Sequence, residues 1–292
     1  MEIMLKLTIG KLNIQLNGVD AEQIPDNTLL FRSDFQGEAD LTYTIRIGEN
    51  PPVISSPVIY RAKDIMVFGK PDGLEARLLY MPDSRDCYAY YEEISEKEIN
   101  IYVNGAYLNH LKIDTIFISL LALERHEERR GAFILHCAYM SFDGKAILFS
   151  GPSGIGKSTH SGLWCNEYPD RTCVLNGDKC LLTMDDGRLF ANGWPVCGSS
   201  GICQNERREV AAIILLQQSM INQFIEEKPM RNFKQLLAQI TVNYWNNQYT
   251  DDAMNFIESL LQRTGCATYA CNISSEAVVT LYNKLKEKRW IC

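Results

Sequence analysis

Long hydrophobic runs are missing from this chain of 292 residues, since nowhere do about 18 apolar residues follow one another. A transmembrane helix needs a run of roughly that length, so the sequence predicts no membrane partner. The residues from Met1 to Lys6 alternate between apolar and polar too early to form the core of a secretory signal. We therefore expect a cytoplasmic protein.

An excess of basic residues is also missing. The chain has 29 lysines and arginines against 36 aspartates and glutamates, which gives a net charge of −7. Its basic stretches are short, at Arg129-Arg130 and at residues 284–289. Proteins that bind nucleic acid usually carry a basic patch or stripe. The charge pattern therefore excludes nucleic acid as an expected partner.

Paired cysteines are missing as well. None of the ten cysteines stands in a C-x-x-C pair, the nearest two are Cys266 and Cys271, and the four histidines are dispersed. Zinc motifs need paired ligands at short, regular spacing, so no site of that kind is expected. Scattered cysteines indicate free thiols in a reducing compartment.

The remaining composition is ordinary for a globular protein, with 46% hydrophobic and 22% charged residues. The length is typical of one large domain or two modest ones. Composition therefore says little about function, which has to be sought in local motifs.

What the chain does contain is the motif G-x-x-x-x-G-K-[ST], at residues 151–158. In this motif the glycines let backbone N–H groups point at phosphate oxygens, the lysine reaches the β- and γ-phosphates, and the hydroxyl binds Mg²⁺. The residues expected to contact a nucleotide are Gly151, Pro152, Ser153, Gly154, Ile155, Gly156, Lys157, Ser158 and Thr159. The motif predicts nucleotide binding but not the reaction.

The surroundings of the motif favour a phosphate-binding loop over the alternative, a glycine-rich turn without a ligand. Such a loop follows a buried strand and opens a helix. Residues 145–150 form a short apolar run, and residues 157–164 are suited to the first turns of a helix. A helix N-terminus there would add its dipole to the anion site.

The first hundred residues show the period-two alternation of strands, at 5–9, 12–16, 41–47 and 99–103, and Gly10-Lys11 suits a hairpin turn. We expect residues 1–110 to form an antiparallel β-rich region of unknown role. Apolar residues at helical spacing from Ile113 to Arg129 predict a helix. Residues 111–131 would then connect this region to a nucleotide-binding domain at 132–292.

A hairpin is expected to run directly into the phosphate motif. The apolar runs 133–140 and 145–150 flank Asp143-Gly144, a strong signal for a type I′ turn. If these two residues form the turn, the register puts His136 opposite Gly151. His136 would then lie beside the loop, although a slip of one residue would undo this placement.

A carboxylate follows the next predicted strand. Residues 172–175 lead into Asn176-Gly177-Asp178-Lys179. Asp178 stands where a P-loop enzyme needs a carboxylate to hold Mg²⁺ or to take a proton from the acceptor. The alternative is a turn aspartate, because Asn-Gly-Asp is also turn chemistry. Residues 193–201, rich in small side chains, indicate either a loop near a ligand or a simple glycine-rich turn.

Regular elements are predicted up to the C-terminus. A continuous apolar run at 210–216 is typical of a buried central strand. The other expected elements are a hairpin at 180–191, helices at 230–245, 251–263 and 274–286, and a short strand at 267–271. Strands and helices mixed in this way indicate an α/β (α+β) fold.

Taken together, Leu135-His136, Asp143-Gly144, residues 151–158 and Asn176-Gly177-Asp178 resemble the C-terminal domain of the HPr kinase/phosphorylase family. That domain belongs to the phosphoenolpyruvate carboxykinase-like superfamily, in which a hairpin runs straight into the phosphate loop. The resemblance covers about residues 130–290 and none of the β-rich region. It implies a mixed β-sheet P-loop core of phosphoenolpyruvate carboxykinase-like type.

The resemblance also implies roles for the matching residues. Residues 151–158 would bind ATP, and Ser158 and Asp178 would bind Mg²⁺. Asp178 would act as the base, together with His136 and Lys157, and the loop 198–201 would close over the substrate.

Two departures indicate a divergent member of the family. Lys179 stands where HPr kinases usually have a second aspartate, and Gly201 stands where an arginine is expected. Arg207 or Arg208 could replace that arginine, although we expect each to have a role on a helix or loop surface instead.

The leading hypothesis is an ATP-dependent, HPr kinase-like phosphotransferase that transfers the γ-phosphate to a hydroxyl of a protein serine, a peptide or a metabolite. The alternative is a catalytically inactive ATP- or ADP-binding regulatory or scaffold protein, which Lys179 and the missing arginine favour. A third hypothesis, nucleotide hydrolysis coupled to motion, lacks an arginine finger. The sequence leaves open the acceptor and whether the chain forms a homo-oligomer.

Overall fold

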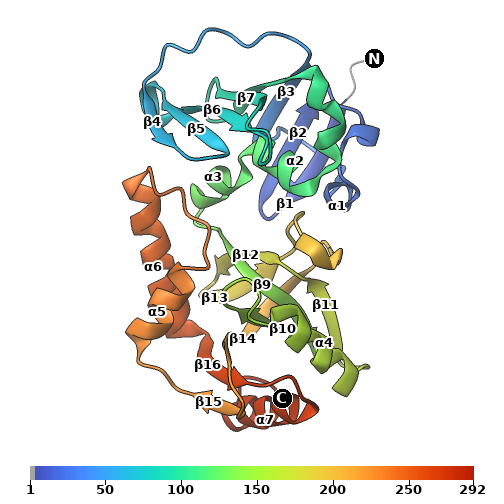
Figure 1. Cartoon of the computed structure of the whole chain (residues 1–292), viewed down its shortest axis with the longest axis vertical. Helices are drawn as coiled ribbons and strands as arrows, with labels where there is room; N and C mark the ends of the chain where they lie inside the picture. Colours follow the sequence, from blue (N-terminus) through green and yellow to red (C-terminus); the bar gives the residue numbers. More distant parts are fainter. Residues whose placement is uncertain (1–3) are drawn as a thin grey trace. The chain divides into compact units, whose positions relative to one another are not determined.

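The computed structural model describes residues 4–292, and the chain divides into two compact units, Met1–Leu123 and Glu124–Cys292 (Figure 1). Each unit is built on its own β-sheet. None of the helices within the described residues has the length and apolar composition needed to cross a membrane.

The first unit contains an eight-stranded sheet with the order β1-β2-β3-β8-β7-β6-β5-β4. Its strands are β1 (Met4–Ile9), β2 (Leu12–Asn17), β3 (Leu41–Ile47), β4 (Val58–Arg61), β5 (Ile65–Gly69), β6 (Glu75–Tyr80), β7 (Cys87–Glu93) and β8 (Glu98–Val103). Its helical segments are η1 (Ala21–Gln23), α1 (Asp26–Leu29), η2 (Pro71–Gly73), η3 (Gly105–Lys112) and α2 (Asp114–Leu121). The predicted first hairpin is confirmed, with Ile9 paired to Leu12.

This sheet is mixed rather than purely antiparallel. β3 runs parallel to both of its neighbours, β2 and β8, whereas the other neighbouring strands are antiparallel. The prediction of an antiparallel region is therefore wrong for the pairs that β3 forms with β2 and β8. Alternation shows which face of a strand is buried but not the direction of the next strand, so the sequence pattern could not reveal the parallel pairs.

The single helix predicted from Ile113 to Arg129 is two helices. α2 ends before Ala122, whose φ of 48° is left-handed, and α3 (Leu123–Glu128) follows. A left-handed residue ends a helix because the regular hydrogen bonds cannot continue through it. The apolar spacing crosses this break without interruption, which is why periodicity predicted one helix.

The second unit contains another eight-stranded sheet, with the order β10-β9-β12-β13-β14-β16-β15 and β11 beside β9. Its strands are β9 (Phe133–Phe142), β10 (Lys145–Ser150), β11 (Thr172–Asn176), β12 (Lys179–Asp185), β13 (Arg188–Asn192), β14 (Arg207–Gln218), β15 (Gln223–Ile225) and β16 (Gly265–Cys271). Its helical segments are α4 (Lys157–Glu167), η4 (Gly198–Ser200), α5 (Pro229–Leu237), α6 (Asn247–Arg263) and α7 (Ser275–Glu287). β10 also pairs with β14, so the path through β9, β12 and β13 closes on itself.

Strand β9 has buried side chains on both faces. Leu135 and Tyr139 belong to one apolar core, to which α5 and α6 contribute, and Ala138 and Met140 belong to a second core with side chains of α4 and α7. A strand that is buried on both faces has a continuous apolar sequence rather than an alternating one. The expected mixed α/β (α+β) class is confirmed.

The hairpin β9–β10 has the predicted turn and register. Asp143 and Gly144 both have positive φ, 47° and 79°, as a type I′ turn requires. Lys145 pairs with Phe142, and Ser150 pairs with Cys137. The strand β10 therefore ends beside His136, which confirms the placement expected from turn chemistry.

The predicted helix over 230–245 is too long. α5 ends at Leu237, and the chain then runs along the start of β9: the N–H of His136 donates to the carbonyl of Gln239 (2.9 Å), and the N–H of Thr241 donates to that of Ile134 (2.9 Å). The apolar spacing of this segment reflects burial against β9 rather than helical structure. The other predicted strands and helices of this unit are confirmed, with small changes at their ends.

Candidate nucleotide-binding site

The glycine-rich motif forms the connection between β10 and α4. β10 ends at Ser150 and α4 begins at Lys157, so the loop follows a strand and precedes a helix, as the sequence predicts. Its three glycines all have positive φ, which residues with a side chain rarely adopt. The exposed residues of the motif are Pro152, Ser153, Gly154, Ser158 and Thr159. An anion could reach the loop and the N-terminus of α4 from solvent.

Lys157 is the buried cation of the motif. Its residue is 7% exposed, and its Nζ donates to the carbonyl oxygens of Gly151 (3.0 Å) and Pro152 (3.2 Å). Burial lowers the pKa of Lys157, and the charge of Asp178 acts in the opposite direction. The structure therefore brings Asp178 within electrostatic range of the motif lysine.

Asn176 forms the turn that precedes Asp178. Its Oδ1 accepts hydrogen bonds from the backbone N–H groups of Asp178 (2.9 Å) and Lys179 (3.0 Å). Its Nδ2 donates to the carbonyls of Trp194 (2.9 Å) and Val196 (3.1 Å), and the residue is fully buried. Because Asn176 carries the turn, the carboxylate of Asp178 is available for other contacts. This finding disfavours the alternative of a simple turn aspartate.

Both oxygens of Asp178 face basic side chains. Nε2 of His136 lies 3.4 Å from Oδ1, and Nζ of Lys179 donates to Oδ2. Hydrogen bonding from His136 holds the pKa of Asp178 well below its usual range; burial opposes this effect, and Lys179 reinforces it. Asp178 is therefore ionised at neutral pH. The ladder between β9 and β12 explains the arrangement, since His136 and Lys179 are direct partners.

Gln239 holds the other side of the His136 ring. Its Oε1 lies 3.2 Å from Nδ1 of His136, and its carbonyl accepts the N–H of the same residue. The ring thus lies between a side-chain amide and a carboxylate, an arrangement that fixes a histidine and its proton in other sites. Sequence reasoning missed Gln239, since it stands 103 positions from His136 in the chain and in a segment predicted as helix.

The small-residue loop after β13 packs on the Asp178 turn. Gly198 has a φ of 58°, and a Cβ at this position would lie 3.1 Å from the Cβ and Cγ of Asp178. A Cβ on Gly177 would in turn lie 2.2 Å from Oγ of Ser200. The loop is therefore a tightly fitted wall of the candidate site. The contact places this loop beside Asp178, and its role as a loop near a ligand stays a prediction.

Two oxygen donors near the motif suit a magnesium ion. The hydroxyl of Ser158 lies 3.4 Å from the carbonyl of Gly177, the residue before Asp178, so the two predicted ligands belong to segments that are in contact. Within the described residues, no group of three or more His, Cys, Asp or Glu could hold a metal ion. Mg²⁺ is usually held by one or two protein oxygens together with substrate phosphates and water. The donor set fits a metal that arrives with a nucleotide.

Neither Arg207 nor Arg208 is shown to replace the arginine that was expected at the position of Gly201. Arg207 pairs with Asp185 and stacks on Phe190, with 3.7 Å between its guanidinium carbon and the ring centre. Arg208 pairs with Glu206 at 2.7 Å. These contacts support the surface role that the sequence analysis favoured for both residues.

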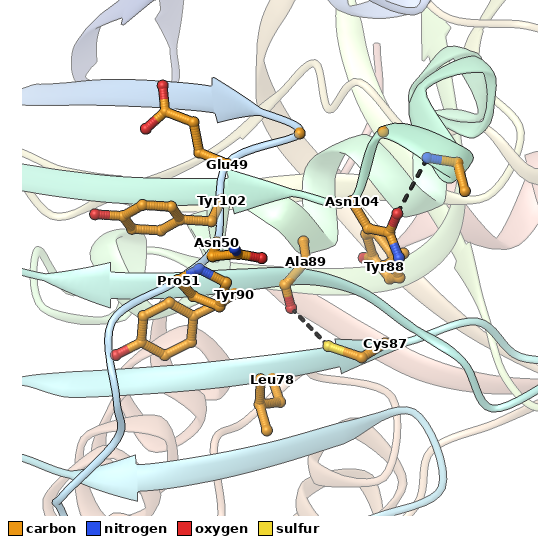
Figure 2. Close-up of a pocket in the computed structure, with 13 residues that line it drawn as sticks. Glu49, Asn50, Pro51, Leu78, Cys87, Tyr88, Ala89, Tyr90, Tyr102 and Asn104 are labelled. Carbon is orange, nitrogen blue, oxygen red and sulfur yellow. Dashed lines mark hydrogen bonds between the residues drawn. The ribbon is translucent and has the colours of Figure 1, made fainter.

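A separate cavity of about 440 Å³ lies within the first unit (Figure 2). Tyr90 and Tyr102 lie side by side in it, with 6.0 Å between ring centres, and Asn50 and Asn104 contribute amide groups. None of its lining residues is a lysine or arginine. The cavity therefore lacks the cations expected of a phosphate site.

No protein-family model and no curated protein sequence matches the chain. Among solved structures, the chain is similar to the Hpr(Ser) kinase/phosphatase from Coxiella burnetii, with 13% sequence identity and a TM-score of 0.33. The similarity covers 53% of this chain and 97% of that one. A similarity of this size carries no argument about function, which has to be derived from the site.

Proposed function

We propose that this protein is an ATP-dependent phosphotransferase that acts on a hydroxyl group. One observation carries the proposal: the carboxylate of Asp178, which His136 and Lys179 keep ionised, directly follows Gly177, whose carbonyl lies 3.4 Å from the hydroxyl of Ser158 in the glycine-rich motif. In a loop that only held phosphate, a carboxylate there would repel the ligand unless a cation lay between them, because like charges repel. A phosphoryl-transfer enzyme needs one to accept the proton of the attacking hydroxyl.

The residues of the site divide the work of the reaction. The N–H groups of the loop and the ammonium group of Lys157 would bind the phosphates and stabilise the charge of the transferred group. Asp178 would accept the hydroxyl proton, and His136 would orient its carboxylate. Mg²⁺, bound with the nucleotide near Ser158 and Asp178, would neutralise charge on the phosphate oxygens.

Lys179 has to move for this reaction to proceed. In the structure it pairs with Asp178, and a carboxylate with a strongly lowered pKa is a weak base. A bound polyphosphate would compete for the ammonium group of Lys179, and loss of that partner would raise the pKa of Asp178. The acceptor would then approach past the loop that contains Gly198. Its identity as a protein serine, a peptide or a metabolite is open.

A second candidate function is an ATP- or ADP-binding regulatory or scaffold protein without transfer activity. The ion pair between Lys179 and Asp178 favours it. In this case the pair would persist with nucleotide bound, and the carboxylate would only balance the charges of Lys157 and Lys179.

Two substitutions test the proposed function. Lys157→Ala should weaken ATP binding, because it removes the buried cation of the loop. Asp178→Asn should leave ATP binding largely intact while transfer falls by about 10²–10⁴-fold, the usual contribution of a general base. Calorimetry measures the binding, and ADP formation with and without hydroxyl acceptors measures the transfer.

The matched control is Asp186→Asn, in the exposed turn between β12 and β13. The left-handed φ of 49° at Asp186 also suits asparagine, so this variant should behave as the unmodified protein. Normal turnover of Asp178→Asn would contradict its role as base. Tight ATP binding without ADP formation under all acceptors would favour the second candidate.

A further inference from the structure

Three neighbouring strands of the second unit run parallel and end at one edge of the sheet. β14 pairs in parallel with β10 on one side and with β16 on the other. The segment that follows β10 is the glycine-rich loop, and the segments that follow β14 and β16 are residues 219–222 and 272–274. In α/β sheets, ligands bind outside the carboxyl ends of parallel strands. These three segments therefore share the edge where a ligand is expected.

The second and third segments expose large apolar side chains. Met220 is 90% exposed, Ile221 65% and Ile273 76%. Single exposed apolar residues are common, but a group of them on adjoining segments usually marks a binding surface.

The two segments are held together by hydrogen bonds rather than by these side chains. The N–H of Asn272 donates to Oδ1 of Asn222 (3.1 Å), and its Nδ2 donates to the carbonyl of Met220 (3.2 Å). The N–H of Ser219 donates to the carbonyl of Cys271 (3.0 Å). The apolar side chains thus stand on an ordered support, which lowers the entropic cost of binding a ligand.

A further contact joins this support to the phosphate loop. Nε2 of Gln218, the last residue of β14, donates to the carbonyl of Gly154 at 3.3 Å. Neighbouring strands lie about 4.8 Å apart, so the segment after β16 lies about 10 Å along the sheet edge from the loop after β10. A nucleoside triphosphate spans a distance of this order between its phosphates and its base.

We propose that Met220, Ile221 and Ile273 form the binding surface for the base of the nucleotide whose phosphates lie on the glycine-rich loop. The inference rests on the proposed nucleotide site and adds where its base is bound. An apolar surface can pack against the face of any base, and the larger ring system of a purine buries more apolar area than a pyrimidine does. The site therefore accepts a purine nucleoside triphosphate with little discrimination between adenine and guanine.

The test compares ATP with inorganic tripolyphosphate, which has the phosphates but no base. Calorimetry on the full chain measures both dissociation constants in the unmodified protein and in the double variant Ile221→Ser/Ile273→Ser. ATP binding should weaken by about tenfold, in keeping with the loss of apolar area buried against the base, whereas tripolyphosphate binding should not change. Met230→Ser, at a 64% exposed apolar residue of α5, is the matched control and should alter neither constant.

Unchanged ATP binding in the double variant would overturn the inference, and so would a parallel loss of tripolyphosphate binding. If Lys157→Ala abolished binding of both ATP and tripolyphosphate while the double variant had no effect, the phosphate site would be supported and the base site would be wrong. If the unmodified protein bound neither compound, the proposed function would fail and the base site with it. A binding partner other than a nucleotide would then have to explain the apolar surface.

Discussion

Gly198 lies directly against the carboxyl group of Asp178. A Cβ at position 198 would come within 3.1 Å of Cγ and 3.3 Å of Oδ1, and the φ of 58° already disfavours a side chain. Both constraints therefore disfavour a side chain at this position. The contact makes the position of the loop after β13 and that of the Asp178 carboxylate depend on each other.

We expect Gly198→Ala to lower transfer activity by at least about tenfold while ATP binding is retained. The added methyl group has to displace the carboxylate by a few tenths of an ångström, and misplacement of a base by such distances is costly. The control is Gly201→Ala, which has a similar φ of 65° but open space at the Cβ. Both variants should lose about 1–2 kcal/mol of stability from backbone strain. Equal activity in the two variants would contradict the argument.

Gln239→Leu should lower transfer activity and change the pH dependence of kcat. The amide of Gln239 is the partner of Nδ1 of His136, so its loss frees the ring to turn away from Asp178. Gln235→Leu, which removes a 3.3 Å contact with Thr268, is the matched control and should keep the original pH profile. A purely structural role for Gln239 would alter stability but leave the pH profile in place.

Asn176→Ala should destabilise the second unit by roughly 2–4 kcal/mol, because it leaves buried backbone groups without their hydrogen bonds. Urea unfolding measures this loss. Asn192→Ala, which removes bonds to the carbonyl of Leu181 (2.9 Å) and to Thr183 (3.0 Å), should cost a similar amount. Only Asn176→Ala should also lower transfer activity under conditions where both variants remain folded, because the side chain of Asn176 holds the backbone of Asp178.

His160, in the first turn of α4, should make the protein less stable in acid. Burial lowers the pKa of His160 to about 4, below the usual value of about 6.5 in an unfolded chain. Between these values the unfolded state binds the proton and the folded state does not, so stability falls as the pH is lowered from about 6.5 to 4. The ring packs edge-on against Phe149, with 4.9 Å between ring centres.

The His160→Leu variant isolates this effect. On the order of 2 kcal/mol of the stability difference between pH 7.5 and pH 5 should disappear in it, as measured by urea unfolding at both values. An unchanged pH dependence would show that folding does not lower the pKa of His160.

Much of the fold could be predicted from local sequence signals. Asp143-Gly144 specified the turn, and the turn specified the register that brings His136 to the end of β10, because a two-residue turn leaves no freedom in the pairing. Helix ends were less secure. The left-handed Ala122 has no marker in the sequence. The helix predicted over 230–245 stops at Leu237, because residues 239–241 lie along β9 instead.

The sequence by itself determined the components of the candidate site: the glycine-rich loop, Lys157, Ser158, His136 and Asp178. A few adjacent residues in the sequence are enough to identify each of them. Tertiary structure decided what surrounds Asp178. His136 reaches its carboxylate because β12 lies beside β9, and Gln239 reaches His136 because the chain after α5 returns to the same strand. Gly198 lies against Asp178 because the loop after β13 packs on the turn that contains Asp178. These partners are set by the pairing of segments distant in sequence, and no local pattern records such pairing.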